Sequence, residues 1–400
     1  MQIGSFRWMK SLNKSIILNK ILNSEPISRA QIAKETNLTP PTVGSIVKEL
    51  IEQGIVKEST LGISQGGRKP TMLVINYQSF YVVGVDAGPR EVETILTDLS
   101  GKVMERCSLP ITEKVTEATF LSILETGIET VLQQYIQDKD KIIGIGIAMH
   151  GVIDVETGTS LYAPNLDLKD VPIQQTLEDR FNVMVIVEND ARALALGEVW
   201  FGQGKNSKSM VAVNIGNGVG AGMAVNGKLY HGDNSLAGEI GHMTVDINGK
   251  TCSCGNKGCL QTIISGPAIA ERAVQHLDQA AQSVLKTTSP ITGERVFQAA
   301  EDGDSYAIRI LEETGEYIGI GLTNLIHMIN PSKIIISGGV ARARTFILDP
   351  IVQTIRHRAL TPKAKQTQVV FSNLGEQATA LGAVALLLAA LFERNGEVTM

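Results

Sequence analysis

The chain has 400 residues, of which 43% are apolar and 19% are charged. This composition excludes a disordered acidic tail and a small disulfide-stapled protein, and the length allows two or three domains. The formal net charge of −5 is unevenly distributed: residues 1–80 hold ten Lys or Arg against five Glu (+5), which leaves 26 basic and 36 acidic groups (−10) in the other 320 residues. A basic head and an acidic body with different partners are therefore predicted.

The basic head begins with three helical patterns. Apolar residues recur at helical spacing over 11–22, and two further helices are expected to begin after the capping residues Ser28 and Thr39. Pro40 and Pro41 fit the first turn of the third helix, where a missing N–H costs nothing. Two strands, expected at 55–58 and 72–75, enclose a glycine-rich tip. This order predicts a winged helix-turn-helix over residues 1–75.

The third helix and the wing carry the predicted DNA contacts. Small polar side chains and a lysine on the outward face of a helix suit close approach to base edges in the major groove. Two cations beside a glycine hinge suit phosphates or a minor groove. The predicted DNA-binding residues are Pro41, Thr42, Ser45 and Lys48 in the helix and Arg68 and Lys69 in the wing. The alternative is a three-helix interaction module whose basic residues are only solvated.

The acidic body, joined to the head by a linker at 76–80, shows two series of short strands and helices. Strands are expected at 81–86, 91–98, 102–109 and 141–148 with a helix at 116–137, and then at 209–214, 221–225, 333–337 and 368–371 with helices between 266 and 327. Two α/β subdomains are predicted, residues 81–190, completed by a C-terminal helix at 378–394, and residues 191–377, which also hold the dimerisation surface. The cleft between them is the expected ligand site.

The longest apolar run, Ala378–Phe392, is fifteen residues long and ends at Glu393 and Arg394. It is too short to span a bilayer, so we expect a buried helix. The N-terminal residues lack the continuous apolar core of a signal peptide. A cytoplasmic protein without membrane contact is therefore expected.

Three of the four cysteines lie close together, downstream of a histidine. The pattern His242-x9-Cys252-x-Cys254-x4-Cys259 supplies one imidazole and three thiolates, which are the ligands of a closed tetrahedral Zn²⁺ site. Such a site has no open position for water, so its role is structural rather than hydrolytic. Chance clustering is the alternative, and Cys107 is read as an ordinary residue.

Polar side chains suited to a polyol lie around this loop. Carboxylates and amides hydrogen-bond the paired hydroxyls of a sugar, and they discriminate sharply because a buried polar group left unpaired is costly. The candidates are Asn165, Glu188, Asn189, Asp190, Glu239, His242 and Gln261. Each alone is equally consistent with a helix cap or a surface charge. Glycine turns at 86–89, 214–222 and 337–339 follow strands and suggest a nucleotide-binding ancestor.

The sequence resembles the ROK family (repressors, open reading frames, kinases) over essentially its whole length, with a head and wing of the xylose-repressor type. The segments that carry the resemblance are Gly66-Gly-Arg-Lys-Pro70, Val187-Glu-Asn-Asp-Ala-Arg192, Gly238-Glu-Ile-Gly-His242 and Cys252-Ser-Cys-Gly-Asn-Lys-Gly-Cys259. The resemblance implies an α/β fold with an N-terminal winged helix-turn-helix and a two-subdomain actin-like (ribonuclease H-like) body, a structural zinc, and a homodimer or tetramer. It also implies that Asp190 matches the general base of the family kinases and that Asn165, Asn189, Glu239 and His242 match residues that hold the sugar.

Several residues depart from the pattern of the kinases. The departures are Pro89 and Arg90 in the first phosphate loop, Asn217 in the second, Gln261 for a sugar-binding glutamate, Arg192 for an asparagine and His150 for a proline. Phosphoryl transfer depends on positioning and on charge neutralisation, so an altered phosphate loop predicts a body without kinase activity, in which Asp190 is a vestigial base.

These patterns together predict a homodimeric transcriptional repressor that binds a pseudo-palindromic operator. A sugar or sugar derivative in the cleft is the expected effector, as inducer or as corepressor, because its differential affinity for two states would shift the population between them. One alternative is an active ATP-dependent sugar kinase that uses Asp190. Another is a regulator controlled by a partner protein.

Overall fold

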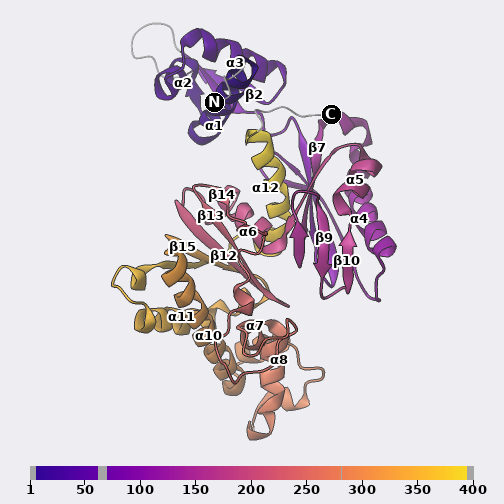
Figure 1. Ribbon diagram of the computed structural model, residues 1–400, viewed down its shortest axis with the longest axis vertical. Coiled ribbons are helices and arrows are strands. Elements are labelled where there is room, and N and C mark those ends of the chain that lie inside the picture. Colours follow the sequence, from indigo (N-terminus) through magenta and orange to yellow (C-terminus); the bar gives the residue numbers. More distant parts are fainter. Residues whose placement is uncertain (1–5, 62–69, 281, 394–400) are drawn as a thin grey trace.

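The computed structural model describes residues 6–61, 70–280 and 282–393. A small head lies at one end of the molecule, and two α/β parts follow below it (Figure 1). The C-terminal helix lies beneath the head and reaches the region between the two larger sheets (Figure 1).

The head is a winged helix-turn-helix. Its elements are α1 (Phe6–Ser24), β1 (Ile27–Ser28), α2 (Arg29–Thr36), α3 (Pro40–Glu52), β2 (Val56–Leu61) and β3 (Thr71–Ile75). The hydroxyls of Ser28 and Thr39 accept hydrogen bonds from backbone N–H groups and cap α2 and α3, as predicted. The wing sheet has the order β1-β3-β2. The sequence did not reveal β1, because two residues are too few to show a period.

The first α/β part contains a five-stranded sheet in the order β11-β7-β4-β5-β6. Its strands are β4 (Tyr81–Ala87), β5 (Glu91–Asp98), β6 (Val103–Pro110), β7 (Ile142–Met149) and β11 (Met184–Asn189). Strands β4, β5 and β6 are antiparallel neighbours, whereas β7 and β11 continue the sheet in parallel. Helices α4 (Glu117–Leu132) and α5 (Ile173–Phe181) lie on one side of this sheet (Figure 1).

The second α/β part repeats this connectivity in a sheet of order β14-β13-β12-β15-β16. Its strands are β12 (Ser209–Ile215), β13 (Val219–Val225), β14 (Lys228–Leu229), β15 (Lys333–Ser337) and β16 (Gln368–Phe371), and its α-helices are α7 (Gln261–Ile264), α8 (Gly266–Gln275), α9 (Gly293–Glu301), α10 (Ser305–Ile329) and α11 (Arg344–Arg358). Three antiparallel strands again precede two parallel ones. The duplicated sheet confirms the two-part α/β body. The predicted boundaries at residues 190 and 377 stay predictions.

Two helices, α6 (Asp190–Trp200) and α12 (Ala378–Glu393), pack against each other between the sheets. Strands β4 and β7 carry glycines where α12 crosses them: a Cβ on Gly146 would lie 2.0 Å from the carbonyl oxygen of Ala383. The stretch Gly375–Glu393 is long and apolar enough to cross a membrane, but 67% of its apolar 18-residue window is buried inside the protein. This burial agrees with the predicted core helix.

Some elements differ from the sequence-based expectations. A small antiparallel sheet, β8 (Val152–Asp154), β9 (Thr159–Ala163) and β10 (Leu168–Val171), was not predicted, and neither was the parallel strand β11. The helix expected to end at 137 ends at Leu132, and a polar 3₁₀ segment, Gln133–Lys141, replaces its last turns.

Candidate functional site

A cleft of about 1150 Å³ lies between the two sheets. Its wall includes the turn between β4 and β5, the start of α6, the turn between β12 and β13, the segment 238–261 that carries the predicted metal ligands (the metal loop), and the turn after β15. These are the ends of strands at which ligands of open α/β sheets bind. The cleft therefore lies where the sequence predicted a ligand site.

Six of the predicted sugar-binding residues line this single cleft: Asn165, Asn189, Asp190, Glu239, His242 and Gln261. Asn165 comes from the loop between β9 and β10, Asn189 and Asp190 come from the start of α6, and the other three come from the metal loop. Amide, carboxylate and imidazole groups from three parts of the chain thus surround one space.

Asn189 has a structural task in addition to its place in the wall. Its Oδ1 accepts from the backbone N–H groups of Ala191 at 3.0 Å and Arg192 at 3.2 Å, so it is the N-cap of α6. Its Nδ2 donates to the carbonyl of Gly151 at 3.1 Å. Asn189 therefore both caps α6 and lines the cleft.

Two carboxyl groups line the cleft, Asp86 near the end of β4 and Asp190 at the start of α6. Loss of solvation raises the pKa of Asp86, and the negative charges of Asp190, Glu93 and Glu91 raise it further, to about 8. Burial also raises the pKa of Asp190, although His150 and the backbone N–H of Ala191 partly offset this effect. The centre of the cleft thus favours protons, cations or hydrogen-bond donors such as sugar hydroxyls.

Glu188, the seventh candidate, does not line the cleft, which corrects its assignment to the sugar-binding residues. It is 3% exposed, and its carboxylate is occupied by Arg192 Nε at 2.7 Å and by His231 Nε2, which donates over 2.6 Å. Arg192 is 2% exposed, and its Nη1 donates to the carbonyl of Ser235 at 2.7 Å. Arg192 and Glu188 therefore hold the loop at 230–238 in place, and this loop leads into Glu239. Sequence reasoning noted Arg192 only as a departure from the kinases.

His150 is a lining residue that sequence reasoning did not assign to the site. Its imidazole is 6% exposed, and Nδ1 donates to the carbonyl of Ala87 at 3.0 Å. Its side chain lies in the cleft wall, close enough to Asp190 to lower the pKa of that carboxyl group. The signal available in the sequence was that His150 stands before Gly151, where the family often has a proline.

The turns that suggested a nucleotide-binding ancestor also line this cleft. Gly88, Pro89 and Arg90 form the turn after β4, and the glycines at 216–220 and 338–339 are further lining residues. A Cβ on Gly338, whose φ is +88°, would lie 2.5 Å from Asn214 Oδ1, so this turn needs glycine. Pro89 has no N–H to offer to a phosphate.

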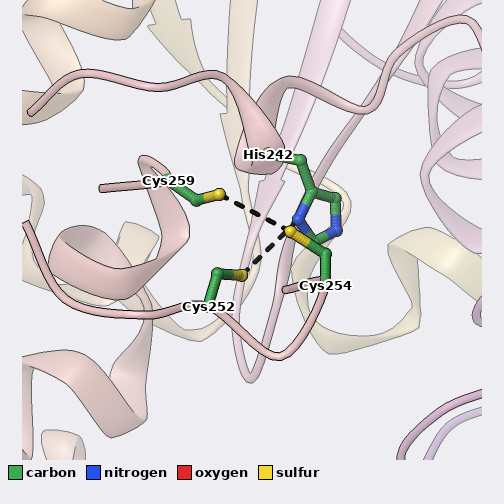
Figure 2. Close-up of side chains that lie close together, drawn as sticks. All are labelled: His242, Cys252, Cys254 and Cys259. Atoms are coloured by element: carbon green, nitrogen blue, oxygen red, sulfur yellow. Dashed lines mark hydrogen bonds between the residues drawn. The ribbon is translucent and has the colours of Figure 1, made fainter. Parts of the chain in front are cut away.

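The predicted metal ligands form one cluster (Figure 2). The donor atoms of His242, Cys252, Cys254 and Cys259 all lie within 4.8 Å of one another. The sulfurs of Cys254 and Cys259 are 3.7 Å apart, and Nδ1 of His242 is 3.6 Å from the sulfur of Cys252. A tetrahedral Zn²⁺ with ordinary bond lengths gives about 3.8 Å and about 3.6 Å for these pairs. The four side chains can therefore hold a metal ion.

Hydrogen bonds around the cluster favour a thiolate. Burial opposes ionisation of Cys252, but hydrogen bonds from the backbone of Cys254 and from Gln261 lower its pKa to about 6. The Gln261 amide nitrogen donates to the sulfur of Cys252 at 3.2 Å. Gln261 therefore lies at the metal cluster as well as at the cleft, a link that the spacing alone did not reveal. The other ring nitrogen of His242 faces Glu239, 3.9 Å from its carboxylate.

The outward face of α3 carries the predicted DNA contacts of the head. Pro41, Ser45 and Lys48 are exposed and Thr42 is half-buried, whereas the opposite face packs into the core of the head. Arg68 and Lys69 lie outside the described residues. The positive charge of the head is partly internal, since Lys14 is 2% exposed and pairs with Glu49 at 3.0 Å.

These parts define a winged DNA-binding head joined to an actin-like, kinase-type body. A winged helix-turn-helix DNA-binding model matches residues 16–57, and the ROK family model matches residues 82–390. The chain belongs to the ROK family.

Relatives and solved structures resemble nearly the whole chain. A xylose repressor from Bacillus subtilis (strain 168) is 32% identical over 388 residues, 97% of this chain and 98% of that protein. An N-acetylglucosamine repressor from Escherichia coli O157:H7 is 34% identical over 390 residues, 98% and 95% of the two chains. A crystal structure of a ROK family transcriptional regulator, a homologue of the E. coli MLC protein, superposes with a TM-score of 0.86 at 31% identity, covering 96% of this chain and 97% of that chain.

Kinases share the body. A ROK family glucokinase from Streptomyces griseus, solved with glucose and AMPPNP, superposes with a TM-score of 0.68 at 29% identity and covers 76% of this chain and 98% of that chain. The body fold is thus common to regulators and kinases, so the fold alone does not decide between them.

Proposed function

We propose that the protein is a sugar-responsive transcriptional repressor. As a homodimer, its two heads bind the half-sites of a pseudo-palindromic operator, and a sugar or sugar derivative binds in the cleft of the body. The observation that carries this proposal is that one chain combines two features. Helix α3 exposes the face that holds the predicted DNA contacts, and the cleft is lined by six side chains of the kind that bind sugars. The names of the repressor relatives point in the same direction.

Sugar recognition rests on Asn165, Asn189, Asp190 and Glu239, with His242 and Gln261 at the metal side of the cleft. Asp86 and Asp190 accept hydrogen bonds or share a proton, which suits a ligand rich in hydroxyl donors. The sugar changes operator affinity only to the extent that it binds two conformations of the protein unequally. A closed cleft that holds the heads away from the half-site spacing meets this requirement.

The metal is Zn²⁺ in this proposal, and its role is structural. Three thiolates and one imidazole leave no open coordination position, so the ion holds the loop that carries Glu239 and Gln261 in place. No step of ligand recognition passes through the ion itself.

The body binds sugar without phosphorylating it. Pro89 and Arg90 alter the turn that would cradle a phosphate, and phosphoryl transfer needs that turn for positioning and charge neutralisation. Asp190 therefore binds a hydroxyl rather than activating it. The relatives named as repressors agree with a regulator that acts in the cytoplasm.

Titration of the purified protein with D-xylose, D-glucose and N-acetylglucosamine, with and without a DNA fragment from its own upstream region, tests the proposal. We expect firm DNA binding and saturable binding of at least one sugar that changes the DNA affinity. DNA binding with no response to any sugar would favour control by a partner protein. ATP turnover coupled to sugar would instead establish a kinase.

A further inference from the structure

Helix α6 connects the sugar cleft to the side of the body beneath the head. Its first residue, Asp190, lies in the cleft wall, and its last residue, Trp200, completes a helix of 11 residues. At 1.5 Å per residue the helix is about 16 Å long. Residues 191–198 are all buried, so the helix runs through the protein rather than over its surface.

At its far end, α6 contacts the end of α12. The rings of Trp200 and Phe392 lie 5.4 Å apart between centroids, with an angle of 56° between their planes. Phe392 is 2% exposed, so this aromatic contact is part of the core.

The two helices pack through glycines, which bring their backbones close together. A Cβ on Gly197 of α6 would lie 2.9 Å from Gly382 of α12, and a Cβ on Gly382 would lie 2.2 Å from the carbonyl oxygen of Ala193. Close-packed elements of this kind move together, because separating them would open a void in the core.

The end of α12 binds directly to the head. The carbonyl of Phe392 accepts from Ser15 Oγ at 2.8 Å and from Asn19 Nδ2 at 3.1 Å, both on α1. The last carbonyls of a helix have no partner within the helix, so α1 supplies the missing donors. Ile17, Leu18 and Ile21 of α1 belong to the same hydrophobic cluster as Phe392.

We propose that α6 and α12 form one rigid unit that carries the state of the sugar cleft to the DNA-binding head through the Ser15–Asn19–Phe392 contact. This inference rests on the proposed function and names how its regulation is transmitted. A ligand that draws Asp190 and Asn189 into a closed cleft tilts α6, and Trp200 and Phe392 shift with it. The head then turns on α1, which alters its match to the operator half-sites.

The double variant Ser15→Ala/Asn19→Ala tests the contact, with Gln53→Ala, an exposed amide at the end of α3, as the matched control. Operator affinity is measured by fluorescence anisotropy with and without whichever of D-xylose, D-glucose and N-acetylglucosamine the wild type binds. Allosteric couplings commonly change affinity about 5–150-fold. We expect a change in this range for the wild type and Gln53→Ala, and less than about twofold for the double variant. Sugar affinity without DNA, and DNA affinity without sugar, stay as in the wild type.

A second readout needs no DNA. The chain has two tryptophans, Trp8 and Trp200, so Trp8→Phe leaves Trp200 as the single reporter at the far end of α6. We expect its emission to change with the same dissociation constant as sugar binding measured by calorimetry. If the double variant responds like the wild type, or if Trp200 emission stays constant at saturating sugar, the relay is wrong although the sugar-responsive repressor stands. If the double variant loses operator binding even without sugar, the Ser15–Asn19–Phe392 contact only positions the head and does not transmit the state of the cleft. A wild type that responds to no sugar would overturn the proposed function, and the relay with it.

Discussion

Arg192→Met should destabilise the body by several kcal/mol. The guanidinium is 2% exposed, and Arg192 is bonded to Glu188 and to the carbonyl of Ser235, each at 2.7 Å. Its removal leaves Glu188, which is 3% exposed, without its buried cation. Breaking such a pair from one side costs about 3–5 kcal/mol. With an unfolding entropy of about 0.6 kcal/mol per kelvin for a body of about 300 residues, the melting temperature should fall by roughly 5–8 °C.

Differential scanning calorimetry of Arg192→Met and of the double variant Glu188→Leu/Arg192→Met measures this effect. The double variant should recover at least half of the loss, because no uncompensated buried charge remains. The pH dependence follows from Glu188, whose burial is outweighed by His231 and Arg192 so that its pKa lies below the ordinary value of 4.5. A carboxyl group whose pKa is lowered by folding stabilises the folded protein at higher pH, and this contribution is lost as the pH falls through the folded pKa. The difference in melting temperature between the wild type and Arg192→Met should therefore shrink in acid. A single variant that melts within about 1 °C of the wild type, or a double variant as unstable as the single one, would refute the account.

Three further outcomes are expected. Cys254→Ser should reduce the bound zinc found by atomic emission and lower the melting temperature, whereas an equally stable, metal-free wild type would contradict the structural role. Gly238→Ala should abolish sugar binding in calorimetry. The φ of Gly238 is +103°, and the new Cβ would lie 1.8 Å from the carbonyl oxygen of Ala221, so the backbone must shift and displace Glu239. Unchanged sugar affinity would contradict this role of Gly238. Asp86, with a pKa raised from 3.8 to about 8, should destabilise the fold as pH rises through that range, so the melting temperature of Asp86→Asn should fall less than that of wild type between pH 5.5 and 8.5; parallel curves would refute it.

Local patterns predicted the parts of the site that depend on nearby residues. Thr39 caps α3 as expected because a cap and the N–H groups it satisfies lie within one turn. The cysteine spacing predicted the metal cluster because the ligands of a compact loop lie within a short span of sequence. The order of strands predicted a duplicated body, since each strand is bounded by its own turns.

Local sequence patterns could not predict contacts between residues that lie far apart in the sequence. Glu188 was grouped with the sugar-binding residues, and nothing in its surroundings along the chain indicates His231, 43 residues away. Lys14 was counted in the charge of the basic head, but it is 2% exposed and pairs with Glu49, 35 residues on. Strand β11 was missed although its neighbour β7 was found, because pairing in a parallel sheet is not visible in local periodicity.

The place of α12 sets the timing of folding during synthesis. The head is synthesised before the body and holds most of its buried apolar residues within 17–75, so it can fold before α12 is made, since domains fold as units from the N-terminal side. The body cannot complete its core at that stage. Helix α12 covers the glycine-lined faces of β4 and β7 and one side of α6, and these surfaces stay uncovered until α12 has been translated. A nascent or prematurely terminated chain would therefore present a folded reading head on an unfinished body. Only the synthesis of α12 brings Phe392 to Ser15 and Asn19, so this helix decides whether the head comes under control of the cleft.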